Sequence, residues 1–296
     1  MCATNTMSDI DAIAGVLVEA ALAGGAAIMP IYDGPIEVRE KADSFPVTAA
    51  DEAAEAAILA LLAKHAPGIS VISEESVSKG TVPEIGRHFF LVDPLDGTKE
   101  FIARNGEFTV NIALIQDGAP IAGIVYAPAV RRMFFGIAGR GAREARVEDG
   151  KLGAWRNVTV RNPPAVGLTA VASRSHSNPE TEEFLAGFPI AARISAGSSL
   201  KFCLIAAGEA DLYPRLGRTM EWDTAAGHAV LAAAGGRVTL MDGAPLRYGK
   251  REQDADVDFA NPWFVGWRKE AGVEPHRICR RLQTLRRWSH HEQDDK

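Results

Sequence analysis

Apolar side chains recur at helical spacing in two stretches near the beginning of the chain. The first covers residues 9–29, and we expect it to end at Pro30, because proline has no N–H to continue a helix. The second opens at residues 47–51 and stops at Pro67-Gly68. Between them, residues 36–41 are short and mixed, as in a strand or a hairpin edge. The pattern predicts two amphipathic helices ahead of a strand-rich region.

Short apolar runs of strand length follow, separated by turn residues. Asp117-Gly118 stands between two of these runs and favours a tight hairpin turn. Regular short strands joined in this way indicate an antiparallel meander. We expect strands over 69–73, 89–92, 108–115, 121–126 and 132–137, a polar loop over 76–87, and a hairpin or loop over 139–157.

From residue 166 onward strands and helices alternate, which is typical of an α/β layer. The expected strands are 166–173, 190–195, 210–213, 237–240 and 261–265, and the expected helices are 178–185, 200–207 and 224–234. The change of pattern predicts an α+β domain over residues 1–160 and an α/β domain over 161–268. Residues 269–296 carry paired basic residues and an acidic end, and we expect an amphipathic or disordered tail outside the core.

Two carboxylates lie at the end of the central apolar run, in the string Asp93-Pro94-Leu95-Asp96-Gly97. We expect the strand to stop at Pro94, which cannot donate to a sheet ladder. Asp93 and Asp96 would then point into one small volume and repel each other unless a cation lay between them. Hard oxygen ligands at this density suit Mg²⁺, and the hydroxyl of Thr98 is able to hold a nucleophilic water. The alternative is an ordinary Asp-rich turn.

Three further acidic positions lie at the ends of expected elements. Asp51 is in the first turn of the second helix, where a carboxylate is often only a favourable charge. Glu74 and Glu75 follow the 69–73 strand, and adjacent glutamates are usually solvated surface charge. Asp223 precedes the 224–234 helix, as an ordinary N-cap does. Taken alone, each position is compatible with a structural or a functional role.

Three cationic or protonatable side chains lie at the ends of expected elements in the α/β half. His176 follows one strand, Arg215 ends another, and Lys201 lies just inside a helix that opens with a Gly/Ser turn at Ser198. Strand C-terminal ends converge on the ligand crevice in such layers, and a helix start can offer N–H groups to an anion. These groups would therefore gather around an anionic ligand. Scattered surface charge is the alternative.

Several strings resemble motifs of the inositol monophosphatase-like superfamily of metal-dependent, lithium-sensitive phosphatases. They are Pro46-Val47-Thr48-x-x-Asp51, Ser73-Glu74-Glu75-Ser76, Asp93-Pro94-Leu95-Asp96-Gly97-Thr98 and Trp222-Asp223-x-Ala225-Ala226-Gly227. The Lys99-Glu100-Phe101 ending and the Ser-Arg-Ser-His, Gly-Ser-Ser-Leu-Lys and Pro-Arg strings are similar to the 3'(2'),5'-bisphosphate nucleotidase (CysQ) branch. The resemblance runs from about residue 10 to residue 267, and the charged insert 251–258 departs from it.

The resemblance implies a role for each candidate residue. Two or three Mg²⁺ ions would be held by Glu74, Asp93, the Leu95 carbonyl, Asp96 and Asp223. Asp51 and Thr98 would orient the attacking water, while the N–H groups of Gly97 and Thr98 would hold the phosphoryl oxygens. The nucleotide would be contacted by His176, Ser198, Lys201 and Arg215. His228 is expected to be a packing residue only.

The resemblance also implies a fold and an activity. The fold is the two-domain α+β and α/β sugar-phosphatase fold, layered αβαβα, with the site between the domains. The activity is Mg²⁺-dependent hydrolysis of the 3'-phosphate of adenosine 3',5'-bisphosphate (PAP) to AMP and phosphate, in sulfur metabolism, with PAPS as a further candidate substrate. Alternatives are an inositol monophosphatase or a fructose-1,6-bisphosphatase of the same superfamily. A non-catalytic phospholigand-binding protein is also conceivable, but it would not need the water-positioning pair.

Composition narrows the class of protein. The 296 residues are 47% hydrophobic and 24% charged, as in an ordinary globular protein large enough for two packed units. A net charge of −6 argues against a surface that coats a nucleic acid polymer. The expected ligand is instead a small phosphorylated nucleotide, bound by a monomer or a homodimer.

Three cysteines with no paired spacing fit a reducing compartment and neither a disulfide framework nor a zinc site. No basic segment precedes the first apolar stretch, which argues against a secretory signal. Asp11, Glu19 and Gly24-Gly25 interrupt that stretch, so we expect a soluble helix and no membrane span. These features predict a cytoplasmic protein and leave peripheral membrane association open.

Overall fold

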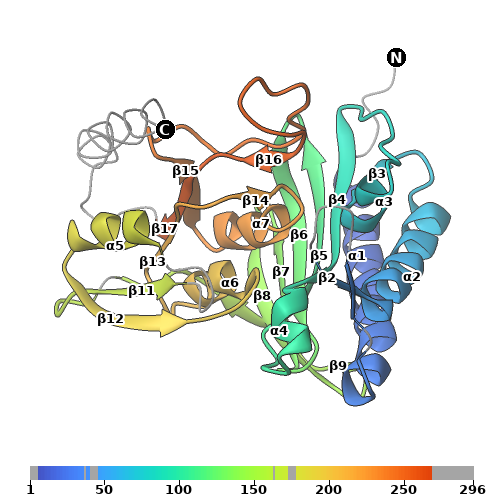
Figure 1. Cartoon of the computed structure of the whole chain (residues 1–296), viewed down its shortest axis with the longest axis horizontal. Coiled ribbons are helices and arrows are strands. Elements are labelled where there is room, and N and C mark those ends of the chain that lie inside the picture. Colours follow the sequence, from blue (N-terminus) through green and yellow to red (C-terminus); the bar gives the residue numbers. More distant parts are fainter. Residues whose placement is uncertain (1–5, 37, 41–45, 163, 173–177, 269–296) are drawn as a thin grey trace.

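A computed structural model describes residues 6–36, 38–40, 46–162, 164–172 and 178–268. In Figure 1 the elements form five layers from right to left. A helical layer of α1 and α2 covers a large sheet, α6 and α7 lie on the other face of that sheet, and a smaller sheet and α5 follow. This is the αβαβα arrangement expected from the sequence. The expected tail, 269–296, lies outside the described residues.

The outer helices are α1, Thr6–Asp33, and α2, Ala49–His65. Their inner faces bury Leu17, Ile28 and Ile58 against the large sheet. The prediction that α1 ends at Pro30 was wrong. The helix continues for three more residues, because the backbone angle that proline fixes is helical and only its N–H bond to the preceding turn is lost.

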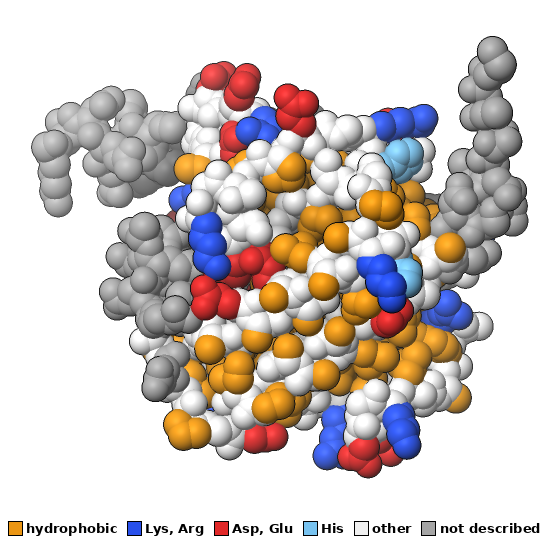
Figure 2. Space-filling model, turned by 90° about the vertical axis from the view of Figure 1, so that its right-hand side faces the viewer, with side chains coloured by type: hydrophobic (Ala, Val, Ile, Leu, Met, Phe, Trp, Pro, Cys, Tyr) orange, Lys and Arg blue, Asp and Glu red, His pale blue; other side chains and the backbone are white. Residues whose placement is uncertain are grey.

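Alanines make up much of the outward surface of these two helices. Ala12 and Ala26 of α1 and Ala56, Ala60 and Ala63 of α2 are exposed. Figure 2 faces this side of the molecule and shows hydrophobic side chains spread across it, with charged groups among them. By length and composition, the Ala12–Asp33 part of α1 could also cross a membrane, and 39% of its most apolar window is buried. In the structure it packs on α2 and β6, as a core helix does.

The N-terminus of α2 is closed by a capping box. The Thr48 N–H and hydroxyl both donate to Asp51 Oδ2 at 2.7 Å, and the Ala50 N–H donates to the Thr48 hydroxyl at 3.2 Å. A short hairpin, β1 (Val38–Glu40) and β2 (Pro46–Thr48), leads into it. This box fixes where the Asp51 carboxylate lies.

The large sheet is the expected antiparallel meander with one parallel strand at its edge. Its order is β10-β8-β7-β6-β5-β4-β3, with β9 paired to β8, and only β3 and β4 run parallel. Its strands are β3 Ser70–Ser73, β4 His88–Asp96, β5 Thr109–Gln116, β6 Ala119–Ala127, β7 Arg132–Ile137, β8 Gly141–Glu148, β9 Lys151–Leu152 and β10 Arg156–Val158. Helices cover both faces, so alternate residues of β4 enter different clusters: Phe89 faces α6 and α7, and Phe90 faces α1 and α2.

Two other predictions about this region were incomplete. Residues 139–157, expected to be a hairpin or loop, contain the full-length strand β8. The expected loop 76–87 begins with the end of the short helix α3, Glu74–Ser78. Glycine and charged residues weaken the apolar alternation in residues 139–157, which fits the place of β8 toward the edge of the sheet.

Strand β4 continues through Pro94, against the expectation that it stops there. Its pairing with β5 is regular as far as Asp93↔Asn111 and resumes at Asp96↔Thr109. Because the ladder skips Pro94 and Leu95, the missing proline N–H removes no sheet hydrogen bond. The irregularity turns this strand end into a small loop that carries both aspartates. Gly97 follows with a positive φ of 93° and starts the short helix α4, Thr98–Ile102.

The smaller sheet has the order β12-β11-β13-β17-β15 and is mixed. Strand β11 is parallel to β12 and β13, whereas β17 is antiparallel to β13 and β15. Its elements are β11 Leu168–Ala172, α5 Pro179–Ala186, β12 Ile190–Ser195, α6 Leu200–Ala206, β13 Leu212–Arg215, α7 Ala225–Ala233, β15 Gly236–Leu240 and β17 Phe264–Arg268, with a separate pair of β14 Thr219–Met220 and β16 Ala260–Asn261. Asn178 caps α5 as expected, accepting from the Thr181 N–H.

Helix α7 lies close against the large sheet over two paired glycines. Gly123 of β6 is in register with Gly136 of β7. A Cβ added at Gly123 would lie 2.6 Å from the Ala226 carbonyl oxygen, and one at Gly136 would lie 2.7 Å from the Val230 Cα. The glycines therefore set how deeply α7 lies on the sheet. The expected domain boundary near residue 160 falls after the last strand of the large sheet, but the two halves bury one common cluster that includes Phe89, Phe202 and Val230.

Candidate active site

Three carboxylates from separate elements meet where the two halves of the protein face each other. Glu74 begins α3, Asp93 lies in β4, and Asp223 lies two residues ahead of α7. One oxygen from each lies within 4.8 Å of the others. Parallel pairing brings the end of β3 beside β4, with Ser73 opposite Val92, which explains how Glu74 comes to lie near Asp93. The structure therefore brings together three of the predicted metal ligands.

Asp96 lies beside this trio and is held by neutral donors. Its Oδ2 accepts from the Ser199 N–H at 2.8 Å and the Asn111 amide at 3.1 Å. Burial raises the pKa of Asp96 to about 6, although the nearby Lys201 ammonium and these donors act to lower it. Burial lowers the pKa of Lys201 to about 8, and Asp96 is the largest influence against that shift. The two groups therefore lie close enough for the charge of each to act on the pKa of the other.

Asp51 and Thr98 are brought together from positions 47 residues apart. The Thr98 hydroxyl lies 3.2 Å from Asp51 Oδ1 and 3.5 Å from the Leu95 carbonyl oxygen. Asp51 is 2% exposed, and its other carboxylate oxygen belongs to the capping box. The first-turn role and the predicted functional role of Asp51 are therefore compatible, because each uses a different oxygen.

The turn at Ser198 and Ser199 links the two halves of the site. Ser198 has a positive φ of 51°, and its hydroxyl oxygen lies 2.7 Å from the Asp96 carbonyl oxygen and 2.9 Å from that of Glu107, which share its one proton. The Ser199 hydroxyl donates to the Asp223 carbonyl at 2.6 Å. Ser199 is the N-cap residue of α6 without capping it through its side chain. The pair thus connects the Asp96 loop with the Asp223 loop.

The donor set fits a hard divalent cation. Burial raises the pKa of Asp223 well above its usual range, and the neighbouring charges of Asp96 and Glu74 raise it further. Converging carboxylates of this kind repel one another unless a cation lies among them. All the side-chain donors are oxygens, which is the ligand type that Mg²⁺ prefers. Asp93, 1% exposed, also accepts the Leu95 N–H at 3.1 Å, which orients it within its loop.

Two of the predicted cationic groups lie near each other beside this cluster. The ammonium of Lys201 lies 5.4 Å from the Tyr213 ring centroid and 3.4 Å from the Ala196 carbonyl oxygen, and the positive charge of Arg215 adds to the lowering of its pKa. Arg215 donates from Nη2 to the Arg218 carbonyl at 2.9 Å. Among the described atoms, its buried Nε has no hydrogen-bond partner. His176, the third predicted group, lies outside the described residues.

Residues 9–269 match the model of the inositol monophosphatase family. This chain is a member of that family. It is 50% identical over 244 residues to the 3'(2'),5'-bisphosphate nucleotidase CysQ of Shigella flexneri, covering 81% of this chain and 93% of that one. For the protein of the same name from Buchnera aphidicola, the identity is 41% over 82% of this chain and 89% of the other.

Solved structures agree with this membership. The fold matches the CysQ of Bacteroides thetaiotaomicron, described as a bacterial member of the inositol monophosphatase family, with a TM-score of 0.71 and 38% identity over 90% of this chain and all of that one. An inositol monophosphatase from Anabaena matches with a TM-score of 0.71 and 26% identity over 93% of this chain and 96% of that one. The layered fold expected from the sequence is confirmed.

Some residues of the site in this family member were not anticipated from the sequence. Thr109 and Asn111 are the first and third residues of the largely apolar strand β5, where they are buried and face Asp96. Polar residues inside an otherwise apolar run were the available signal, because buried amides and hydroxyls require partners. Glu221, two residues before Asp223 and 0% exposed, gave a similar signal. The partner of each depends on tertiary contacts that spacing does not contain.

Proposed function

We propose that this protein is a Mg²⁺-dependent 3'(2'),5'-bisphosphate nucleotidase, which removes the 3'-phosphate of PAP to give AMP and inorganic phosphate. The main support is that Glu74, Asp93 and Asp223 converge in a chain 50% identical to a protein named for that activity. PAPS is proposed as a further substrate, and sulfur metabolism as the setting. We also propose a cytoplasmic location and a monomeric or homodimeric state.

Mg²⁺ would be held by Glu74, Asp93, Asp96, Asp223 and the Leu95 carbonyl, with two or three ions in all. Bound there, it would supply Lewis-acid polarisation of the phosphoryl group and of the attacking water. The protein's own contribution to the step begins with Thr98. Since the Thr98 hydroxyl can donate to Asp51 Oδ1, its oxygen remains able to accept a hydrogen bond from water. Asp51 and Thr98 would thereby orient the water for in-line attack on phosphorus. The water oxygen would bond to phosphorus as the bond from phosphorus to the 3' oxygen breaks, and the proton that the water loses balances the one that the released 3' hydroxyl takes up.

The scissile phosphate would be bound by the residues after β4. The N–H groups of Gly97 and Thr98 would donate to its oxygens. The phosphate that is not cleaved would be bound by His176, Ser198, Lys201 and Arg215. Lys201 and Arg215 fit this role because both lie next to the carboxylate cluster. The Ser198 hydroxyl already contacts two carbonyl oxygens, so its part in binding is through the shape of the turn.

Phosphate release from PAP tests the proposal, with Mg²⁺ or with excess chelator. PAPS, inositol 1-phosphate and fructose 1,6-bisphosphate should be assayed in parallel, the last two because relatives in this family include inositol monophosphatases. We expect PAP to have the highest kcat/KM and chelator to abolish turnover. Full hydrolysis in excess chelator rules out the metal mechanism, and a preference for inositol 1-phosphate reassigns the substrate within the family.

Substitution of the proposed ligands gives a second test. Asp93→Asn and Asp96→Asn should lose Mg²⁺ and most of kcat, because each removes a charged ligand from a hard-cation site. Asp117→Asn is a suitable control, since Asp117 is an exposed turn residue paired with Arg87. Wild-type kcat in either ligand variant would exclude that residue from the site.

A further inference from the structure

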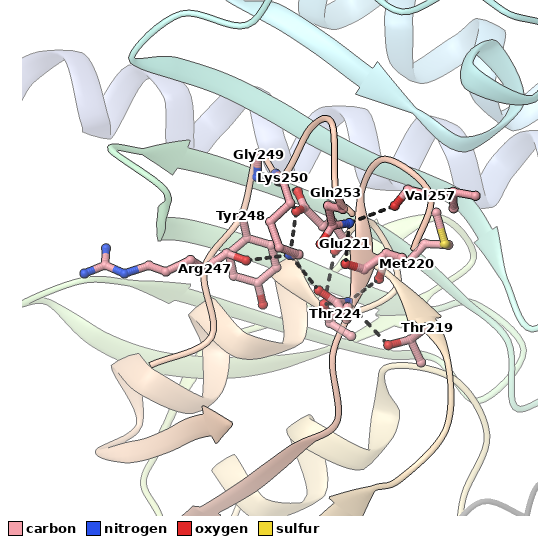
Figure 3. A network of polar contacts seen from close by, with 12 residues as sticks. Thr219, Met220, Glu221, Thr224, Arg247, Tyr248, Gly249, Lys250, Gln253 and Val257 are labelled. Atoms are coloured by element: carbon pink, nitrogen blue, oxygen red, sulfur yellow. Dashed lines mark hydrogen bonds and ion pairs between the residues drawn. The ribbon is translucent and has the colours of Figure 1, made fainter. Parts of the chain in front are cut away.

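A buried polar network joins the residues just before α7 to the segment 247–261 (Figure 3). Its centre is the side chain of Glu221, which is 0% exposed. The Glu221 carboxylate accepts the N–H of Gly249 at 2.6 Å, the N–H of Lys250 at 2.9 Å and the Lys250 ammonium at 2.6 Å. The same ammonium donates to the Arg247 carbonyl at 2.7 Å and to the Asn261 side-chain oxygen at 3.1 Å.

The backbone of Glu221 is fixed as firmly as its side chain. Its N–H donates to the Phe259 carbonyl at 2.8 Å. Its own carbonyl accepts the N–H groups of Thr224 at 3.2 Å and Ala225 at 3.0 Å, which are the first groups of α7. Glu221 therefore ties the start of α7 to the segment 247–261.

Asn261 holds the same loop from its other side. Its amide nitrogen donates to the Met220 carbonyl at 2.7 Å and to the Thr224 hydroxyl at 3.0 Å. These two partners flank Asp223 in the sequence, and the Met220 N–H donates to Asp223 Oδ2 at 2.9 Å. The residues on both sides of Asp223 are thus connected to one ammonium group, that of Lys250.

We infer that Glu221, Lys250 and Asn261 are positioning residues, which hold the 219–224 loop so that the Asp223 carboxylate is oriented for a divalent cation before the cation binds. This inference rests on the proposed metal site. It concerns residues outside the metal-binding motifs: Glu221 just precedes one of them, Lys250 lies in the turn that leads into the charged segment 251–258, and Asn261 belongs to β16.

The physical reason lies in the cost of bringing Asp223 to the other carboxylates. Asp223 comes from a loop, whereas Glu74 starts a helix and Asp93 belongs to a strand. A free loop would have to lose conformational entropy on binding the cation, and it would tend to carry Asp223 away from the like charges of Glu74 and Asp96. A network that fixes this loop in the absence of the ion removes that cost from binding.

A buried ion pair is a weak source of folding stability, so orientation of a neighbour is a better account of this one. Groups that orient metal ligands typically change metal affinity ten- to a hundredfold when they are removed. Lys250→Met should therefore weaken Mg²⁺ binding by about tenfold. Glu221→Gln should have an effect at least as large, because one of its oxygens becomes an amide group facing the Lys250 donors.

The experiment is titration of Mg²⁺ into the substrate-free protein by calorimetry, with the thermal midpoint of unfolding recorded for each variant. Wild type, Asp223→Asn, Lys250→Met and Glu221→Gln are compared. Lys250 is partly exposed and its apolar stem is retained as methionine, so this variant keeps the test valid if Glu221→Gln does not fold. The Mg²⁺ concentration for half-maximal phosphate release should shift by the same factor, with kcat at saturating Mg²⁺ within about twofold of wild type.

Asp211→Asn is the matched control. Like Glu221, Asp211 has a fully buried carboxylate. It accepts hydrogen bonds from the Thr169 N–H and from the side chain of Arg161, which is 31% exposed. It lies before β13, at the end opposite Arg215. We expect Asp211→Asn to lower the thermal midpoint as Glu221→Gln does while leaving Mg²⁺ affinity unchanged.

Equal Mg²⁺ affinity in Lys250→Met, Glu221→Gln and wild type would overturn the inference and leave the network a purely structural one. Unchanged affinity in Asp223→Asn, or no Mg²⁺ binding by wild type, would overturn it as well, since the loop would then orient no ligand. Weakened Mg²⁺ binding by the network variants, in a protein that does not hydrolyse PAP, would support the inference and reject the proposed function.

Discussion

Asp51 uses its two carboxylate oxygens for two different purposes, and both bear on which residue this position needs. One oxygen accepts the Thr48 N–H and hydroxyl, and the other lies 3.2 Å from the Thr98 hydroxyl. The cap alone would tolerate other polar residues at this position. The contact with Thr98 requires a carboxylate oxygen that points in a fixed direction, and the capping hydrogen bonds of the other oxygen fix that direction. A residue that looks like an ordinary helix-start charge can therefore also be a functional group.

At the residue scale, the sequence motifs predicted which carboxylates come together. They did not predict the hydrogen-bond partners of individual side chains. Glu74, Asp93 and Asp223 converge as the motifs predict. Ser199 stands at the start of α6, where serine is a common cap, yet its hydroxyl donates to the Asp223 carbonyl and makes no capping hydrogen bond. Capping preference is a local property, whereas this partner is brought in from another loop, so the preference could not reveal it.

Arg215→Ala should raise KM for PAP by about ten- to a hundredfold, through loss of a charge-assisted hydrogen bond worth roughly 1.5–3 kcal/mol. Its buried Nε has no hydrogen-bond partner among the described atoms, so a ligand anion can accept from it. If that binding energy also positions the 3'-phosphate, kcat falls too. Inositol 1-phosphate has one phosphate only and should be nearly indifferent to the change.

The measurement is kcat/KM on both substrates for wild type, Arg215→Ala and Arg218→Ala. Arg218 is the control, because it is 57% exposed and its ion pair is with Asp256. Equal losses on the two substrates would show that Arg215 is structural.

His228 predicts a pH dependence of stability. It lies in α7 with its Nδ1 2.9 Å from the Tyr248 hydroxyl, and burial, with a smaller effect of the Arg247 charge, lowers its pKa to about 3. The unfolded chain binds a proton to this group near pH 6.5, and the folded protein does so only near pH 3. The free energy of unfolding therefore falls as the pH drops through this window, by about 2 kcal/mol between pH 7 and pH 5.

Urea unfolding at pH 7 and pH 5 tests this, with His228→Gln compared with wild type. The variant should lack that part of the pH dependence, whereas His88→Gln, which changes an exposed histidine, should keep it. An identical pH dependence in wild type and His228→Gln would mean that the pKa of His228 is the same in the folded and the unfolded chain.

At the scale of elements, the two prolines show where pattern reasoning reaches its limit. Pro30 and Pro94 each lie inside an element that they were expected to end. Pro94 removes no sheet hydrogen bond, because it lies where the ladder between β4 and β5 is already interrupted. Pro30 removes one helical hydrogen bond, but its fixed φ is helical and α1 continues for three more residues. Whether a proline ends an element therefore depends on the neighbouring strand or turn as well as on the missing N–H.

Two glycines of α1 predict opposite effects of the same substitution. A Cβ at Gly15 would have nothing within 4 Å, so Gly15→Ala should stabilise the protein by about 0.5–1 kcal/mol through lower entropy of the unfolded chain. A Cβ at Gly25 would lie 2.3 Å from the Tyr126 ring, so Gly25→Ala should destabilise it. Each serves as the control for the other in chemical denaturation. Stabilisation by both would mean that the Tyr126 ring moves aside at little cost.

At the scale of the whole molecule, the expected two domains share their interior. Phe202 and Val230 from the second half belong to the same buried cluster as Phe89 and Phe134 from the first. The change of sequence pattern near residue 160 marks the change from one sheet to the other, which composition and periodicity can show. It does not mark a break in the hydrophobic core. Helices α6 and α7 lie between the two sheets, and the apolar pattern of a helix does not reveal whether one or both of its sides are covered.

The full chain should therefore unfold in one cooperative transition, and a fragment of residues 161–268 should not fold alone. Removing the first half would expose the faces of α6 and α7 that now contact the large sheet. Calorimetry of the full chain and near-ultraviolet circular dichroism of the fragment test this. Two separate calorimetric transitions, or a folded fragment, would establish that residue 160 is a true domain boundary.

The glycine pair under α7 has a consequence for how this sequence can change over time. Gly123 and Gly136 touch no ligand, yet a single added methyl group at either would meet the backbone of the helix that follows Asp223. Replacement at these positions would displace that helix outward and move Asp223, the proposed metal ligand that precedes it, although β6 and β7 carry none of the proposed site residues. In a library of random variants they should behave as sites intolerant of any residue except glycine, and a survey confined to the ligand shell would overlook them.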